Sequence, residues 1–274
     1  TSYAMDSGVF SPVYLEDAIP VPEGQIDFRI GLDYHTGMDL DGKDEAGGVS
    51  LQDLFRFGRR TGVLNDPDQR QKIADLFSLR AEMHWGFAEN WQFSLVSPWV
   101  VGEGKHTSGF GEADPVRGFD SAADVTAGLM WRFRDQEGWV PAMALQAKVK
   151  YKTGYDSTDV GTEVKMMMTN EYDSGIRSHI NLLSHAYEGD LSRWNMGFVL
   201  GADGPLCWDG AVRWVADYAF RFNEHNGGTN NSILELGTEW QMADAHRLGL
   251  MTQIGLDNHV LTEDFGFRLM YSYS

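Results

Sequence analysis

The feature that most constrains this chain is a strict alternation of apolar and polar side chains from Gly24 to His35. One face carries the apolar residues Ile26, Phe28, Ile30, Leu32 and Tyr34. The other face carries Asp27, Arg29, Gly31, Asp33 and His35. A repeat of two residues is the repeat of a β-strand. The pattern recurs along the chain with aromatic residues at the strand ends, which is typical of a membrane-spanning barrel.

Eleven segments read clearly as such strands. They are residues 24–35, 79–87, 91–101, 124–133, 143–151, 176–187, 192–201, 211–222, 232–240, 247–257 and 265–273. Because single-chain bacterial barrels have an even number of strands, we expect a twelfth within 163–170 or 204–210. The topology between residues 156 and 210 stays open at this point.

The connections alternate in length, as the loops of an outer-membrane barrel do. Short turns are predicted at 88–90 and 134–140, and long connections at 36–71, 102–123 and 153–174. We therefore predict an all-β fold: a transmembrane, antiparallel, up-and-down β-barrel of about 12 strands with long extracellular loops and short periplasmic turns. Residues 1–23 are expected to form an N-terminal periplasmic extension, and residues 24–274 a single outer-membrane barrel domain.

Aromatic residues gather near the predicted short turns. They are Trp85, Phe87, Trp91, Trp131, Phe133 and Trp139. In a barrel they form an aromatic girdle at one membrane interface. In the competing interpretation, a soluble β-sandwich, they are core residues.

Composition excludes several classes of protein. With 22 basic and 40 acidic residues, the formal net charge of −18 argues against nucleic acid as a partner. Cys207 is the single cysteine, so no disulfide framework or zinc site is expected. No stretch approaches the 18 apolar residues of a spanning helix, which leaves strands as the means of crossing a membrane.

Assigning faces by parity predicts a charged lumen. The lumen-lining set is Asp27, Arg29, Asp33, His35, Arg80, Glu82, His84, Asp124, Arg132, Lys148, Lys150, Lys152, Arg177, His179, Arg213, Asp217, Arg221, Glu235, Glu239, Arg247, Asp257 and Arg268. This set is nearly balanced in charge, so the excess of acid belongs to loops and termini. It is either a cross-linked structural core or the lining of a narrow polar pore that selects weakly for anions.

The first long loop contains a basic segment from Leu51 to Arg60. Arg56, Arg59 and Arg60 either fold inward as a constriction or sit on a short surface helix that contacts lipopolysaccharide phosphates. The sequence favours neither alternative.

No catalytic, cofactor or metal site is predicted. His106 and Ser108 in a glycine-rich loop and the inward His179 lack the arrangement that a lipid hydrolase needs. The acidic segment 156–163 departs from an EF-hand loop. Acidic loops are expected at most to collect divalent cations.

Three segments resemble one outer-membrane family. Gly86 to Trp99, Asp124 to Phe133 and Ala147 to Gly154 are similar to turn and strand motifs of the family labelled for the MetA pathway of phenol degradation. The resemblance is best over residues 81–154. It implies an outer-membrane barrel that passes small, often aromatic or hydrophobic, molecules, and it transfers no catalytic residue. In such barrels the last residue is usually aromatic, whereas here Ser274 follows Tyr273.

We therefore expect a passive channel in the outer membrane of a Gram-negative bacterium. The alternative functions are an anchor or scaffold barrel in a cell-envelope complex and, less favoured, a barrel lipid hydrolase. Expected partners are outer-membrane lipid, lipopolysaccharide, a small solute and envelope proteins. The solute, the openness of the lumen and the oligomeric state do not follow from the sequence.

Overall fold

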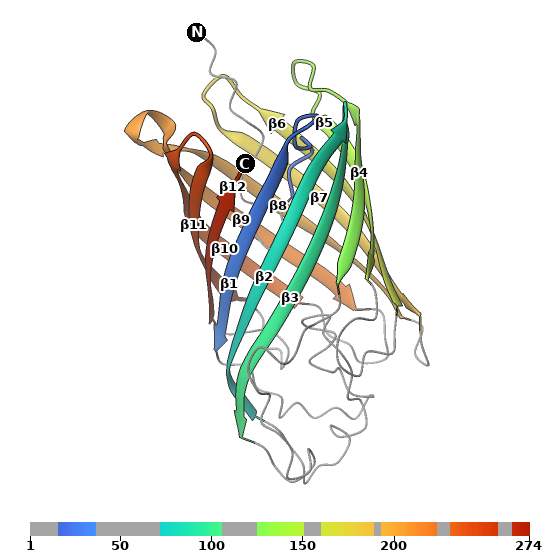
Figure 1. The fold of residues 1–274 in the computed structure, drawn as a ribbon, viewed down its shortest axis with the longest axis vertical. Helices are drawn as coiled ribbons and strands as arrows, with labels where there is room; N and C mark the ends of the chain where they lie inside the picture. Colours follow the sequence, from blue (N-terminus) through green and yellow to red (C-terminus); the bar gives the residue numbers. More distant parts are fainter. Residues whose placement is uncertain are drawn as a thin grey trace.

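A computed structural model of the chain shows a closed antiparallel β-barrel (Figure 1). It describes residues 16–36, 72–105, 125–150, 160–188, 193–223, 231–256 and 265–274. Over these residues the chain forms twelve strands: β1 (Ile26–Thr36), β2 (Lys72–Ala88), β3 (Trp91–Lys105), β4 (Thr126–Arg134), β5 (Ala142–Lys150), β6 (Val160–Glu171), β7 (Arg177–Glu188), β8 (Arg193–Cys207), β9 (Val212–Asn223), β10 (Asn231–Ala243), β11 (His246–Gly255) and β12 (Phe265–Tyr273).

The strands follow one another around the wall in sequence order, and the last pairs with the first. Phe28 of β1 lies opposite Tyr273 of β12, and Thr36 lies opposite Phe265. Closure leaves no strand with an unpaired edge, which is the condition for placing a sheet in lipid. The predicted fold, an up-and-down barrel with about 12 strands, is confirmed.

The strand that the sequence left unplaced is β6. It covers the first of the two predicted locations, 163–170. In the second location, Gly204 to Cys207 continue β8, and Trp208 to Gly210 form a single 3₁₀ turn. The predicted long connection over 153–174 is therefore wrong across 160–171. The three consecutive methionines Met166 to Met168 hide the alternation there, and pairing with β5 and β7 on both sides supplies the strand.

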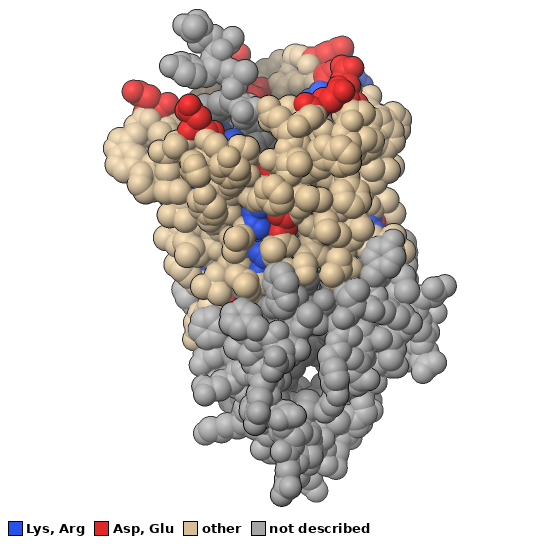
Figure 2. Space-filling model, in the orientation of Figure 1, with Lys and Arg blue, Asp and Glu red and all other residues tan. Residues whose placement is uncertain are grey.

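The two faces of the wall differ as the alternation predicts. In β1, Phe28 and Ile30 are about half exposed at 49% and 53%, whereas Asp27 and Asp33 are buried at 1% and 4%. The other strands likewise expose apolar side chains and bury polar ones, which is the opposite of a soluble protein. Leu129, Leu182 and Leu250 are among the exposed residues. Figure 2 shows this outer surface as a band mostly free of charge below a rim of acidic side chains.

The short turns gather at one end of the barrel. The turn between β2 and β3 is Glu89-Asn90, with Asn90 in the left-handed region at φ 65°, and the turn between β10 and β11 is Asp244-Ala245. The end of β12 lies at this same end (Figure 1). Because the short turns of outer-membrane barrels are periplasmic, we name this end the periplasmic mouth. The described residues include no helix long and apolar enough to span a membrane.

Candidate functional site: the lumen and its N-terminal segment

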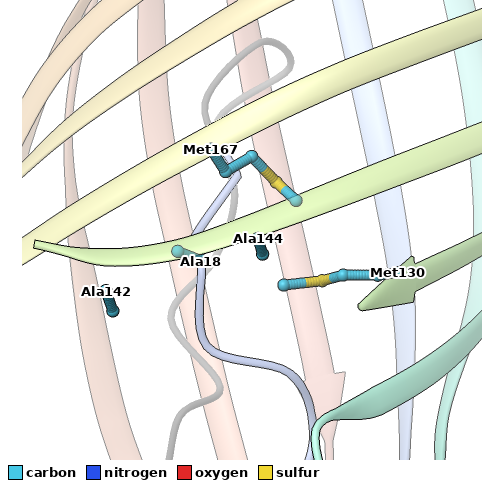
Figure 3. Packing of buried hydrophobic residues seen from close by; sticks show 5 residues of the cluster. All are labelled: Ala18, Met130, Ala142, Ala144 and Met167. Carbon is cyan, nitrogen blue, oxygen red and sulfur yellow. The ribbon is translucent and has the colours of Figure 1, made fainter. Parts of the chain in front are cut away.

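Residues 16–22, which precede β1, lie inside the periplasmic mouth; we call them the mouth segment. Ala18 is fully buried, and its backbone N–H donates to Thr169 Oγ1 over 3.0 Å. The N–H of Val21 donates to Gln92 Oε1 over 2.8 Å. Figure 3 shows Ala18 beside Met130, Ala144 and Met167, which project from the wall. The division of the chain at residue 23 stays a prediction, but the mouth segment is in contact with the barrel interior.

Gly86 makes room for this segment. A Cβ at position 86 would lie 2.2 Å from the carbonyl oxygens of both Val21 and Pro22. The N–H of Gly24 donates to the Gly86 carbonyl over 2.6 Å, and the N–H of Gly86 donates to the Gln25 carbonyl over 3.1 Å. The chain thus passes directly over β2 at a residue without a side chain.

Glu16 is held by two lysines of the wall. Its carboxylate contacts Lys148 Nζ and lies 3.1 Å from Lys165 Nζ. Glu163 is the second carboxylate near these lysines, at 3.5 Å and 3.7 Å. Burial of Glu16 opposes its ionisation, but Lys148 and Lys165 outweigh burial and lower the pKa of Glu16 to about 2. Glu16 is therefore a carboxylate under all physiological conditions.

Asp17 makes a second attachment, to Arg177. The distance from Arg177 Nη1 to Asp17 Oδ2 is 2.7 Å. The same guanidinium reaches Asp203, with 3.1 Å between Nη2 and Oδ1. Asp203 also accepts a hydrogen bond from Arg213 Nε over 2.9 Å, and its Oδ1 lies 2.8 Å from His179 Nε2. Asp203 is 1% exposed, so this network is buried.

Thr169, His179 and Asp203 have the order of a catalytic relay. His179 Nδ1 lies 3.0 Å from Thr169 Oγ1, and Nε2 faces Asp203. However, two guanidinium groups contact Asp203, and the Thr169 hydroxyl accepts the Ala18 N–H. The three side chains therefore position the mouth segment, and the hydroxyl is covered rather than presented to a substrate.

The opposite wall contains further buried ion pairs. Arg29 Nε lies 2.7 Å from Asp27, and Arg80 Nε lies 2.5 Å from Glu82. The remaining close pairs in this part of the wall are His84 with Glu82 at 2.9 Å, Arg268 with Asp33, and Arg247 with Glu239 at 3.9 Å. Buried charges need such partners, because an unpaired one would lose its hydration.

Asp217 and Glu235 form a pair of two acids rather than an ion pair. They lie opposite each other in the register of β9 and β10. Glu235 accepts a hydrogen bond from Gln253 Nε2 over 2.8 Å and lies 3.6 Å from Arg268 Nη1. Neither oxygen of Asp217 has a hydrogen-bond partner among the described residues. Two acids thus share one stretch of wall.

The structure places most of the predicted lumen residues on the interior face. Buried are Asp27, Arg29, Asp33, Arg177, His179, Arg213, Asp217, Glu235, Glu239, Arg247 and Arg268. Side chains with partial exposure are Arg80, Glu82, His84, Arg132 and Lys148. Arg132 lies at the short-turn end, where Asn90 accepts its Nε–H over 2.8 Å. That these residues line a conducting path stays a prediction.

For the other predicted site residues, the structure describes either no part of the residue or the backbone alone. They are His35, Asp124, Lys150, Lys152, Arg221 and Asp257 of the lumen set, Arg56, Arg59 and Arg60 of the predicted constriction, and His106 and Ser108. The acidic segment 156–163 is described from residue 160 onward. Among the described residues no three His, Cys, Asp or Glu side chains are grouped to hold a metal ion.

Five charged residues of the site were not predicted from the sequence pattern. Glu163 and Lys165 belong to the unplaced strand, Asp203 lies beyond the predicted end of its strand, and Glu16 and Asp17 precede the first strand. Glu163, Lys165 and Asp203 follow the alternation of inward and outward residues once β6 is recognised and β8 is extended to Cys207. For Glu16 and Asp17 no periodic signal exists, because the mouth segment is not a strand.

Five of the six predicted girdle residues form a chain of ring contacts on the outer surface, and the sixth, Trp139, contacts Tyr172. The rings of Trp91 and Trp131 stack with centroids 5.6 Å apart, and Trp85 and Phe87 lie 5.7 Å apart. Phe133 lies 5.7 Å from Trp131. Trp139 is 83% exposed. This position suits an interfacial girdle, a role that stays a prediction.

Comparisons with solved structures find outer-membrane barrels of similar fold. No family model matches the chain, and no curated protein matches it. The COG4313 outer membrane channel from Pseudomonas putida F1 is similar in structure, with 10% identity, a TM-score of 0.66 and coverage of 97% of this chain and 99% of the other. The NanC porin is 9% identical with a TM-score of 0.55, over 91% of this chain and 100% of the porin.

At these identities the likeness concerns the fold. Together with the closed wall, the exposed apolar band and the polar interior, it makes this chain an outer-membrane β-barrel of a Gram-negative bacterium. The resemblance to outer-membrane barrels is thus confirmed, whereas the phenol-degradation family itself stays a prediction. The scaffold and lipid-hydrolase alternatives are likewise untested.

Proposed function

We propose that this protein is a passive outer-membrane channel for small solutes, closed at its periplasmic mouth by residues 16–22. The observation that carries the proposal is the way the mouth segment is held. It lies within the barrel and is attached by side-chain contacts to charges of the wall, chiefly Glu16 to Lys165 and Asp17 to Arg177. Such contacts can be exchanged for contacts with solute and water without disturbing strand pairing.

The chemistry of the wall supports polar solutes. The interior face carries buried acids, guanidinium groups and amides, with apolar residues such as Met167 and Val199 between them. A barrel of twelve strands is wider than the eight-stranded barrels that side chains fill completely, and narrower than the water-filled porins. A narrow polar lumen favours small hydrophilic solutes over the hydrophobic or aromatic ones that the family resemblance implies.

Gly86 offers a test that changes no charge. In the Gly86→Ala variant the new methyl group would occupy the space of the Val21 and Pro22 carbonyls, so the mouth segment must move away. We expect a several-fold higher conductance in planar lipid bilayers than in the wild type, and faster entry of small sugars into liposomes. Gly31→Ala is the matched control, because the nearest atom to its Cβ would be 3.8 Å away.

The outcome decides the proposal. A folded Gly86→Ala barrel, recognised by its heat-modifiable migration in gels, that conducts no better than wild type and Gly31→Ala would refute closure by the mouth segment. Absence of conductance and of solute uptake in all three proteins, and also after removal of residues 1–22, would refute the channel itself.

A further inference from the structure

The mouth segment covers a basic region of the wall with two carboxylates. Glu16 contacts Lys148 and Lys165, and Asp17 contacts Arg177. Lys165 is 4% exposed and Arg177 is 6% exposed. The wall contributes carboxylates of its own, Glu163 and Asp203, so each basic group there is shared between a fixed acid and a removable one.

Departure of the mouth segment would change this balance. It takes away two negative charges from a buried region and leaves the cations in place. Lys148, Lys165 and Arg177 would then keep Glu163 and Asp203 as nearby acids, but their positive charge would be incompletely compensated. The region vacated by the mouth segment would therefore attract an anion that brings carboxylates to the same positions.

We propose that Lys148, Lys165 and Arg177 form a binding site for a solute carrying two carboxylates, and that Glu16 and Asp17 occupy this site as tethered substitutes. The proposal deepens the proposed channel function and rests on it only in requiring that the mouth segment can leave. A guanidinium recognises a planar carboxylate through paired N–H donors, and two ammonium groups hold the other carboxylate as point charges.

The spacing of the two tethered carboxylates sets the size of the solute. Adjacent Cα atoms are about 3.8 Å apart, so with both side chains extended the carboxylates of Glu16 and Asp17 are at most about 10 Å apart. Flexible α,ω-dicarboxylates such as adipate and suberate cover this range. A monocarboxylate of equal length, such as hexanoate, would satisfy only one end of the site.

Binding of adipate to the purified full-length barrel in detergent, measured by isothermal titration calorimetry, tests the proposal. In the wild type the solute competes with carboxylates at an effective concentration on the order of millimolar. The double variant Glu16→Gln with Asp17→Asn removes this competition, and we expect its dissociation constant for adipate to be at least tenfold lower. Adding Arg177→Gln to the double variant should abolish the gain.

Glu82→Gln is the matched control. It also removes a lumen carboxylate and leaves a cation, Arg80, but on β2, three strands away from Lys148 on β5. A similar gain of adipate binding in Glu82→Gln would show general attraction by lumen charge and overturn the proposed site. A folded double variant that binds adipate no better than the wild type would overturn it as well.

A second measurement uses the unmodified chain and so does not depend on the folding of a variant. A glutamate-specific protease cleaves after Glu16 only when this residue is released from Lys148 and Lys165. We expect adipate to accelerate this cleavage at least severalfold over adipamide and hexanoate at equal ionic strength. Equal rates with the three compounds would contradict the proposal.

Failure of this proposal can be distinguished from failure of the channel. If the double variant conducts ions better than wild type but binds no adipate, the mouth segment closes a channel and the dicarboxylate site is wrong. If it binds adipate without conducting, the site stands and the channel function falls.

Discussion

Asp203 is the residue whose substitution should most weaken the lumen network. Its carboxylate accepts hydrogen bonds from Arg177 and Arg213 and contacts His179, all at the periplasmic end of the interior. Asp203→Asn keeps the shape of the side chain and removes its charge. Two buried guanidinium groups would then lose a shared counter-ion.

The expected size of the effect follows from these contacts. Removal of one partner of a buried ion pair costs about 3–5 kcal/mol. Here Arg177 retains Asp17, and Arg213 retains a hydrogen bond to the Gly175 carbonyl over 2.9 Å. We therefore expect the lower end, about 3 kcal/mol, which corresponds to roughly a hundredfold shift in the unfolding equilibrium.

Urea unfolding in lipid vesicles, followed by tryptophan fluorescence, measures this free energy. Asp173→Asn in the exposed turn between β6 and β7 is the matched control and should change it by less than about 0.5 kcal/mol. Adding Arg213→Met to Asp203→Asn should recover part of the loss by removing one uncompensated charge. An Asp203→Asn protein as stable as the control would refute the view that this network is held by its charges.

Three further predictions concern the outer wall, the acid pair and the mouth segment. Leu200→Arg, at the middle of β8 on the outer surface, should lower the free energy of unfolding in vesicles by about 2–4 kcal/mol, and Leu206→Arg near the short turn by about 0–1 kcal/mol; equal losses would contradict the membrane orientation. Asp217→Asn should raise the free energy of unfolding in urea by up to about 1 kcal/mol, because it removes one of two acids that lie opposite each other; a lower free energy of unfolding would contradict the view that the two acids repel each other. Glu16 has a pKa of about 2 when docked and an ordinary value of 4.5, so its contribution to docking is fully present above pH 4.5 and is lost as the pH falls toward 2; conductance should therefore be constant from pH 7 to pH 5 and rise only at lower pH, and a rise near pH 6 would contradict this assignment.

Most of the strands and faces could be predicted, because they follow from local alternation. The parity of residues 24–35 placed Asp27 inside and Phe28 outside, and the structure shows the same. The prediction failed where the local pattern is blurred. Met166 to Met168 concealed β6, and with it Lys165 and Glu163 were missed.

The sequence by itself determined that the chain is a barrel, which face of each strand meets lipid, and that the interior is charged. The period of two residues along each strand is a local property, and it suffices for these conclusions. Only the tertiary structure decided which charges meet. Asp17 and Arg177 are brought together by the course of the mouth segment through the closed barrel, and Asp33 meets Arg268 because the last strand pairs with the first. Such contacts depend on register and closure, which join residues far apart in the chain, and no local pattern records them.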